Sequence, residues 1–226
     1  MGRWHAEINL KGTLMRIYAV ADIHAKKHRL ELIHKNVALH SPDVLVAAGD
    51  IAHYFNPEPV FRRLNTLPVP VLAVRGNTDP KSADRLLKSG PNLYNLHLNP
   101  MTVNTIRFVG IGGTIPVPFR SRLCFLEAGP VKKLKACLTP ETVLVAHPPP
   151  RGILDGVLGR FSAGSNAIFS ILKECPPRLF ICGHIHEAPG VVSFNGTEVV
   201  NCTMGRNSAG ALIEYDGRST PSIRML

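Results

Sequence analysis

Ile17-Tyr-Ala-Val-Ala-Asp22-Ile-His24 joins a short apolar run to two polar side chains, an arrangement that recurs along the chain and indicates its fold. Continuous apolar runs are typical of strands that are covered on both faces, as in parallel sheets. The runs of this kind lie at residues 17–20, 44–48, 69–74, 142–146 and 179–182. We therefore predict five buried strands, each followed by a polar loop.

Two stretches between the predicted strands have the apolar spacing of helices. The residues that share one face are Leu30, Ile33 and Val37 within 26–39, and Ile168, Ile171 and Leu172 in the second stretch. Ser165 is a typical N-cap for the second helix, and Pro176 ends it. The alternation of strands and helices predicts an α/β protein.

The pattern changes to hairpins after residue 186. Asn195-Gly196 is a favourable two-residue turn between the strand-like segments 191–194 and 197–200. The sheet system is therefore expected to end with antiparallel strands.

The composition excludes several classes of protein. The chain has 226 residues, of which 45% are hydrophobic, so it can bury a core and is not intrinsically disordered. No apolar run approaches the roughly 18 residues of a membrane span, and the N-terminus lacks the apolar core of a signal peptide. The 5 cysteines are odd in number and lack C-x-x-C spacing, which favours free thiols in a reducing compartment. We expect a cytoplasmic protein without membrane contact.

The formal net charge of +10 favours anionic partners. The basic residues are dispersed, however, in pairs such as Lys26-Lys27 and Lys132-Lys133, and no base-stacking motif accompanies them. Nucleic acid therefore stays open as a partner, although no motif supports it, and the sequence does not predict the oligomeric state.

Residues 1–14 carry no clear pattern, whereas a strand begins abruptly at Met15. We expect 1–14 to be an N-terminal extension or a misassigned start. Because no repeat or low-complexity linker divides the remainder, we expect 15–226 to be a single domain.

Each of the five apolar runs leads, within three residues, to a side chain that can bind a metal ion. These side chains are Asp22, His24, Asp50, Asn77, His147, His184 and His186. In open α/β sheets, ligands bind beyond the carboxyl ends of the strands, where several loops converge. The seven side chains are therefore expected to meet around one cavity.

Ligand chemistry predicts which ions these side chains bind. Residues i and i+2 of an extended chain point the same way, so Asp22 with His24, and His184 with His186, each present two ligands to one cavity. Carboxylate, imidazole and amide ligands without thiolate suit Mn, Fe, Zn, Co or Ni better than Cu(I) or calcium. Seven ligands are too many for one tetrahedral zinc. They fit two divalent ions that share a carboxylate, the arrangement of two-metal phosphoryl transfer.

The spaced motifs resemble those of the calcineurin-like metallophosphoesterases. The family pattern D-x-H, G-D, G-N, H and G-H-x-H is present as Asp22-Ile-His24, Gly49-Asp50, Gly76-Asn77, His147 and Gly183-His184-Ile-His186. The last motif is the most specific, since composition alone predicts about 0.04 matches. The segment from His147 to Asp155, followed by Gly164-Ser165, is similar to the branch that contains cyclic-nucleotide-phosphodiesterase-like proteins.

The resemblance covers about residues 15–215 and implies a four-layer α/β/β/α sandwich with two mixed β-sheets flanked by helices. It also implies two metal sites and a bridging carboxylate. The first ion would be held by Asp22, His24 and His186, the second by Asn77, His147 and His184, and both by Asp50. Of these ligands, Asp50, Asn77 and His147 are expected to act in catalysis.

The activity that the resemblance implies is that of a metal-dependent phosphoesterase, a hydrolase in which a metal-bridging hydroxide attacks phosphorus in line. We expect its substrates to be phosphodiesters of small or cyclic nucleotides. A phosphomonoesterase or a nuclease acting at the same site is the alternative within this chemistry. A non-catalytic metal-binding scaffold is the alternative from a different class.

The chain departs from the family pattern after Asn77, where many members have a His that serves the leaving group. Thr78 cannot supply a proton at neutral pH, and general acid catalysis is worth about 10² to 10⁴-fold. We therefore predict that aryl phosphodiesters are cleaved much faster than alkyl ones, unless another acid such as His53 takes over.

Three further residues near the motifs have two interpretations each. His53 either contacts a substrate phosphate or belongs to the surface. Arg75 either binds the phosphate or pairs at the edge of the core. Asp79, which precedes Pro80, either caps a helix or supports the catalytic loop, and capping is the interpretation that its spacing favours.

Overall fold

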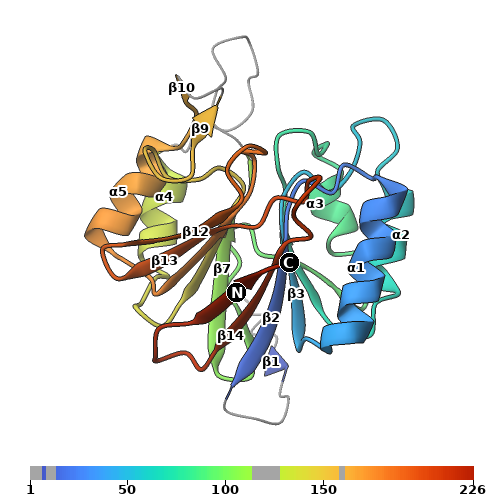
Figure 1. Cartoon of the computed structure of the whole chain (residues 1–226), viewed down its shortest axis with the longest axis horizontal. Helices are drawn as coiled ribbons and strands as arrows, with labels where there is room; N and C mark the ends of the chain where they lie inside the picture. The colour runs from blue at the N-terminus through green and yellow to red at the C-terminus, as the bar shows by residue number, and fades with distance from the viewer. Residues whose placement is uncertain (1–6, 9–13, 114–127, 158–160) are drawn as a thin grey trace.

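The computed structural model describes residues 7–8, 14–113, 128–157 and 161–226. Two β-sheets pack face to face in the middle of the molecule, and helices cover the outer face of each sheet (Figure 1). The chain is therefore a four-layer α/β/β/α sandwich with two mixed sheets, as its motifs imply.

The first sheet has six strands in the order β15-β14-β2-β3-β4-β5. The four strands from β2 to β5 are parallel, whereas β14 and β15 are antiparallel to their neighbours. The bounds are β2 (Met15–Val20), β3 (Val44–Ala48), β4 (Val71–Val74), β5 (Leu93–Asn95), β14 (Ala211–Tyr215) and β15 (Ser222–Met225).

The second sheet has seven strands in the order β1-β6-β7-β8-β11-β13-β12. Its centre is parallel, from β7 through β8 and β11 to β13, and β12 closes one edge as the antiparallel partner of β13. The bounds are β1 (Glu7–Ile8), β6 (Met101–Val103), β7 (Ile106–Ile111), β8 (Val143–Ala146), β11 (Leu179–Cys182), β12 (Gly190–Phe194) and β13 (Thr197–Asn201). A separate antiparallel pair consists of β9 (Gly156–Val157) and β10 (Phe161–Ser162).

Alternate residues of each central strand enter different parts of the core because successive side chains of a strand point to opposite faces. Ile17 and Ala19 of β2 pack between the two sheets, whereas Tyr18 and Val20 pack under the helices of the first sheet. Both faces are apolar, which explains why the strands appear in the sequence as continuous apolar runs.

Helices α1, α2 and α3 cover the first sheet, and α4 and α5 cover the second (Figure 1). Their bounds are α1 (Lys27–His40), α2 (Glu58–Asn65), α3 (Ala83–Leu86), α4 (Ala128–Lys135) and α5 (Asn166–Glu174). The predicted helix faces are confirmed, since Ile33 and Val37 of α1, and Ile168 and Leu172 of α5, are buried in these layers. No helix in the described ranges is long and apolar enough to cross a bilayer.

Local signals in the sequence account for most element boundaries. Ser165 caps α5, with its side chain accepting a hydrogen bond from the amide of Ile168 at 3.2 Å. Asn195 and Gly196 have φ of 49° and 79°, as a two-residue hairpin turn requires, and they join β12 to β13. Strand β4 begins at Val71 and not at residue 69, because Pro70 has no amide hydrogen for the ladder.

The assignment of 1–14 as an extension and of 15–226 as one domain stays a prediction. Within the first segment, β1 pairs in parallel with β6 at the edge of the second sheet.

Candidate metal centre

The seven predicted ligand side chains come together beyond the carboxyl ends of five strands. The loop after β2 carries Asp22 and His24, and the loop after β11 carries His184 and His186. Single residues come from the loops after β3, β4 and β8. The strands belong to both sheets, so the site lies where the two sheets meet. An isolated parallel bridge between Ala21 and Thr203 joins the sheets at this point.

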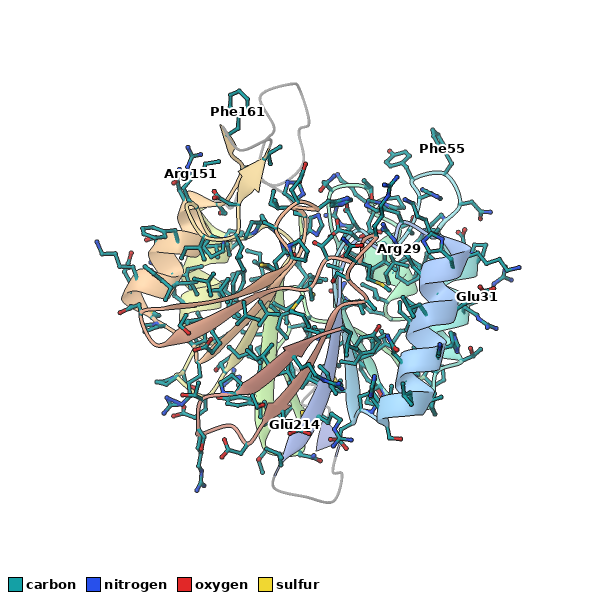
Figure 2. All side chains as sticks on the ribbon, viewed as in Figure 1. Arg29, Glu31, Phe55, Arg151, Phe161 and Glu214 are labelled. Atoms are coloured by element: carbon teal, nitrogen blue, oxygen red, sulfur yellow. The ribbon has the colours of Figure 1, made fainter. Side chains whose placement is uncertain are left out.

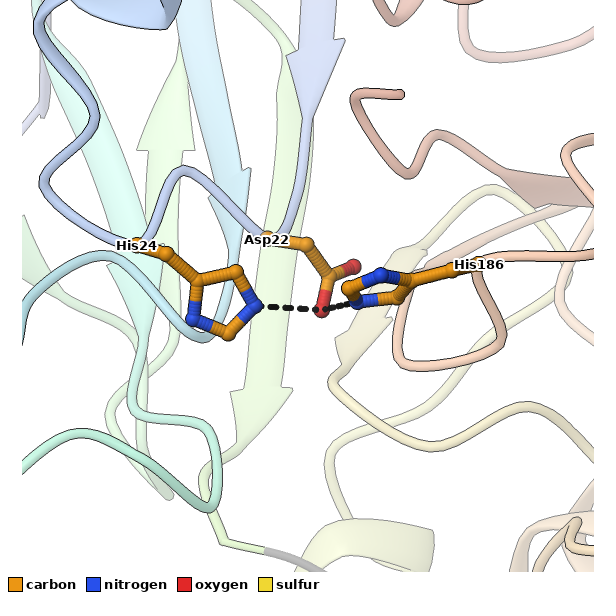
Figure 3. Close-up of side chains that lie close together, drawn as sticks. All are labelled: Asp22, His24 and His186. Atoms are coloured by element: carbon orange, nitrogen blue, oxygen red, sulfur yellow. Dashed lines mark hydrogen bonds and ion pairs between the residues drawn. The ribbon is translucent and has the colours of Figure 1, made fainter. Parts of the chain in front are cut away.

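One group consists of Asp22, His24 and His186 (Figure 3). The Nε2 atom of His186 lies 3.0 Å from Oδ1 of Asp22, and the Nε2 atom of His24 lies 3.7 Å from the same oxygen. Two ring nitrogens thus face one carboxylate oxygen. Asp22 is fully buried, whereas the side chain of His186 is 48% exposed, so this half of the site opens to solvent.

A second group gathers around the fully buried His147. Its Nε2 atom lies 2.9 Å from Oδ1 of Asn77 and 3.2 Å from Nδ1 of His184. The other ring nitrogen, Nδ1, lies 2.9 Å from the carbonyl oxygen of Ala48, so it carries the hydrogen and donates to that oxygen. The Nε2 atom of the neutral ring is therefore the one that faces the site with a lone pair.

Asp50 lies between the two groups and presents one oxygen to each. Its Oδ1 is 3.5 Å from Nε2 of His147, and its Oδ2 is 3.9 Å from Nε2 of His24. The amide of Thr78 donates to Oδ1 at 2.8 Å and fixes the orientation of the carboxylate.

The two oxygens of Asp22 have different environments. Oδ2 accepts hydrogen bonds from the amide of His184 at 2.9 Å and from the hydroxyl of Thr203 at 2.8 Å. Oδ1, which faces the two imidazoles, is left for a further partner. Asn201 continues the network, because its Oδ1 accepts from the amide of Thr203 and its Nδ2 donates to the carbonyl of Ile185.

Glycines allow the loops to approach closely. A β-carbon on Gly76 would meet the Asp50 carboxylate, and one on Gly49, whose φ is 89°, would lie 2.7 Å from Nδ1 of His147. The glycines of the G-D and G-N motifs are therefore required by the crowding of backbone and side chains at the site.

Several non-glycine residues at the site have left-handed backbone conformations, which cost free energy and are common at functional sites. Those with positive φ are Asp22 (59°), His24 (50°), Ala25 (50°), Asp50 (52°) and His184 (73°). The surrounding contacts thus hold the loops that carry the candidate ligands in backbone conformations that these residues rarely adopt.

The electrostatics of the site keep both buried carboxylates ionised. Burial acts against ionisation of Asp22 and Asp50, but the nearby imidazoles and hydrogen-bond donors outweigh burial and lower the pKa of both carboxyls. Burial likewise opposes protonation of His147, yet the Asp50 carboxylate prevails and raises the pKa of His147 to about 9. Burial, and then the charge of His147, lower the pKa of His184 to about 4.

Divalent metal ions fit these donors. In the neutral form of His147, Nε2 and the acceptor oxygen of Asn77 face each other at 2.9 Å, and two acceptors at this distance repel unless a proton or a cation lies between them. A cation also offsets the cost of the two buried carboxylates, Asp22 and Asp50. The ligand atoms within each of the two groups, Asp22-His24-His186 and Asp22-Asp50-His147, lie within 4.8 Å of one another.

Asp79 does not cap a helix, so this predicted role is wrong. Its carboxylate accepts from the amides of Ala52 at 2.7 Å, Gly76 at 2.9 Å and Ile51 at 3.2 Å, whereas α3 begins only at Ala83. Asp79 is almost fully buried, and burial is the main reason why its pKa is raised. It ties the loop that follows Asp50 to the loop that contains Asn77, so it supports the site from beneath.

The remaining predicted residues differ in their distance from the ligands. The hydroxyl of Thr78 lies 3.4 Å from Nδ1 of His24 and has no acidic role there. Arg75 forms an ion pair with Asp84 at 3.3 Å, which agrees with the interpretation that Arg75 pairs at the edge of the core. His53 is exposed, and within the described residues it has no hydrogen bond or ion pair to the seven side chains.

Sequence patterns missed the residues that orient the ligands. Thr203 and Asn201 hold Asp22 and the loop after β11, and Arg29 of α1 donates to the backbone carbonyl of Asp22. These residues lie outside the spaced motifs, so no local signal in the sequence pointed to them.

The model of the calcineurin-like phosphoesterase family matches residues 15–188. An uncharacterised protein of Methanocaldococcus jannaschii is 31% identical over 201 residues, which are 83% of this chain and 87% of that protein.

Two solved structures have similar folds. A dimetal phosphatase from Danio rerio has a TM-score of 0.62 at 13% identity, over 92% of this chain and 98% of the other. An archaeal protein described as a novel phosphodiesterase has a TM-score of 0.55 at 13% identity, over 94% of this chain and 100% of the other. At these identities the likeness concerns the fold alone.

Proposed function

The chain belongs to the calcineurin-like phosphoesterase family and is therefore a metal-dependent phosphoester hydrolase that uses two divalent ions, and we propose that its substrates are phosphodiesters of small or cyclic nucleotides. The observation that carries the two-ion centre is the position of Asp50, which presents one oxygen to His24 and the other to His147. A carboxylate in this position is suited to bridge two ions.

We assign six of the candidate ligands to one ion each and Asp50 to both. Asp22, His24 and His186 would hold the first ion, and Asn77, His147 and His184 the second, with Asp50 shared. When bound, two divalent ions would supply Lewis acidity and would lower the pKa of water toward neutrality.

The protein's own groups prepare these ligands. The carbonyl of Ala48 holds the hydrogen of His147 on Nδ1 and leaves Nε2 free to bind. The amide of His184 and the hydroxyl of Thr203 occupy Oδ2 of Asp22 and leave Oδ1 directed into the site. Oriented ligands lower the cost of assembling the charged site.

Two features support diesters with good leaving groups over other esters. Thr78 stands where many family members have a His, so a strong general acid is missing at that position. Exposed aromatic rings also lie at the same end of the molecule as the site. Phe55 is 94% exposed and lies edge-on to Tyr54 at 5.4 Å, and Figure 2 shows Phe55 and Phe161 on the two sides of this end. Such rings are available to stack on a nucleobase or another aromatic group.

The alternatives act at the same site. A phosphomonoesterase would need to accept one further negative charge on the phosphate, and a nuclease would use the net charge of +10 to attract a polyanion. A metal-binding scaffold would keep the ligands without turnover.

Metal analysis combined with a panel of phosphoesters tests the proposal. The panel contains an aryl diester, cyclic nucleotides, an aryl monoester and single-stranded oligonucleotides, each assayed with Mn²⁺ and after chelation. We expect two bound ions per chain and the highest kcat/KM on the diesters.

Two variants sharpen this test. Asp50→Asn keeps the shape of the side chain but removes its charge, and it should lose most of the bound metal and of the activity. His28→Ala, at an exposed position on α1, serves as the matched control and should retain both. A chain that prefers monoesters or oligonucleotides would contradict the substrate assignment, and full metal content in Asp50→Asn would contradict the bridging role.

A further inference from the structure

Arg29 is a buried arginine directly beneath the candidate metal centre. It belongs to the first turn of α1, is 7% exposed, and its Nη1 atom donates a hydrogen bond to the backbone carbonyl of Asp22. Figure 2 shows Arg29 beside the start of α1, toward the middle of the molecule.

The position of Arg29 is unfavourable for a structural arginine. Burial of a guanidinium is costly, and the first turn of a helix is the end where positive charge is least stable. The helix starts at Lys27 without a side-chain cap and without an acidic residue in its first turn that would pair with Arg29. The buried Nε atom has no hydrogen-bond partner among the described residues. Packing of α1 therefore gives no reason for an arginine here.

The turn that Arg29 contacts is the one that carries two candidate ligands. Asp22, His24 and Ala25 all have positive φ, from 50° to 59°. On one side, their amides donate to the carbonyls of residues 49–51 at 2.8 to 3.0 Å. On the other side, the carbonyl of Asp22 accepts from Arg29. The left-handed turn is thus held from both sides, and Arg29 provides the only side-chain donor to its backbone within the described residues.

We propose that Arg29 is a positioning residue that holds the Asp22–Ala25 turn in its left-handed form and thereby sets the affinity of the Asp22-His24-His186 half of the centre for its metal ion. The inference rests on the proposed function, because it presupposes that this half binds an ion. Arg29 touches neither substrate nor metal in this role and acts through the backbone of Asp22.

Metal titration of the apoprotein tests this role without measuring turnover. In Arg29→Met, which keeps an unbranched apolar stem and removes the donor, we expect one of the two Mn²⁺ ions to bind about 10- to 100-fold more weakly, the usual effect of losing a group that orients a ligand. Arg16→Met is the matched control. Arg16 also donates to a backbone carbonyl, that of His40 at 2.9 Å, but it lies with Glu214 at the opposite end of the molecule (Figure 2), and both ions should bind as in the wild type.

Two backgrounds identify which ion is affected. His186→Gln removes an imidazole ligand of the first ion, and His184→Gln removes an imidazole ligand of the second. Addition of Arg29→Met should leave the remaining ion unchanged in the His186→Gln background and weaken it in the His184→Gln background. A purely structural role of Arg29 would weaken binding equally in both backgrounds and would overturn the inference.

The other outcomes are also decisive. Wild-type affinity for both ions in Arg29→Met overturns the inference, whereas absence of metal binding in the wild type overturns the proposed function instead. If Arg29→Met does not fold, Arg29→Lys decides, because the lysine ammonium ends one bond short of the position of Nη1 and is more strongly hydrated than a guanidinium. Selective weakening of one ion in Arg29→Lys supports the role of Arg29, and unchanged affinity for both contradicts it.

Discussion

Thr78 combines two roles that a residue next to a metal ligand can have. Its backbone amide orients the Asp50 carboxylate at 2.8 Å, and this contact does not depend on the side chain. Its hydroxyl, 3.4 Å from His24, has no acidic proton to give at neutral pH. A substitution of this side chain can therefore change how the leaving group is protonated without moving the bridging carboxylate of Asp50.

The variant Thr78→His should restore a general acid at this position. Because general acid catalysis is worth about 10² to 10⁴-fold and is least needed by good leaving groups, we expect kcat/KM for alkyl diesters to rise by about 10-fold or more. The value for aryl diesters should change by less than about 3-fold. The measurement is the ratio of the two values, with Thr78→Val as the control for loss of the hydroxyl. Equal rates on alkyl and aryl diesters in the wild type would show that another acid already acts.

The ends of the strands form the site because strands of the two sheets approach each other there. The end of β2 in the first sheet lies next to the segments that follow β11 and β13 in the second, and the bridge between Ala21 and Thr203 connects the sheets there. Gly183 follows β11, and a β-carbon at this position would collide with Ala21 and lie 2.7 Å from Oδ2 of Asp22. Close contact between these two strand ends therefore depends on glycine.

The variant Gly183→Ala should push the strand ends apart. Overpacking of this kind typically costs about 1–3 kcal/mol of unfolding free energy. Displacement of the Asp22 carboxylate should additionally weaken metal binding by about 10-fold or more. Chemical denaturation and metal titration measure the two effects. Gly205→Ala, which has open space around its β-carbon, is the control and should be neutral in both. Normal metal affinity in Gly183→Ala would mean that the strand ends tolerate separation.

The molecule as a whole holds its two sheets together by a shared apolar core and by the polar contacts at the site. The core between the sheets includes Ile17 and Val46 from one sheet and Val145 and Ile181 from the other. At the site, buried carboxylates from the first sheet face imidazoles from the second. Bound cations would therefore stabilise the contact between the sheets as well as the loops.

Removal of metal should lower the melting temperature of the whole protein. A ligand present at about 100 times its Kd stabilises the native state by about 2.7 kcal/mol, and 1 kcal/mol shifts Tm by about 2–4 °C in a domain of this size. We expect a chelator to lower Tm by about 5–10 °C, and excess Mn²⁺ to restore it. The same treatment should leave Asp50→Asn unchanged. A chelator-insensitive Tm in a wild-type protein that binds two ions would show that the ions do not stabilise the contact between the sheets.

The elements and the convergence of the ligands were predictable because local patterns encode them. A run such as Val44–Ala48 is apolar at every position since both faces of its strand are covered. Ser165 indicates the start of α5 because its hydroxyl can accept a hydrogen bond from the first turn of a helix. Parallel strands end at the same edge of a sheet, so polar residues after such runs, as at Asp22 and Asp50, are brought together by topology.

Periodicity, capping and turn chemistry act within a few residues, so the amino-acid order already indicates the α/β class and the loops that carry the candidate ligands. The contacts that orient those ligands form only in the folded chain. Thr203 and Asp22 are 181 residues apart, Arg29 reaches Asp22 from the next helix, and Asp79 turns from a predicted cap into an acceptor for the loop that follows β3. Such contacts depend on how loops from different strands and sheets pack together, and no local pattern records that.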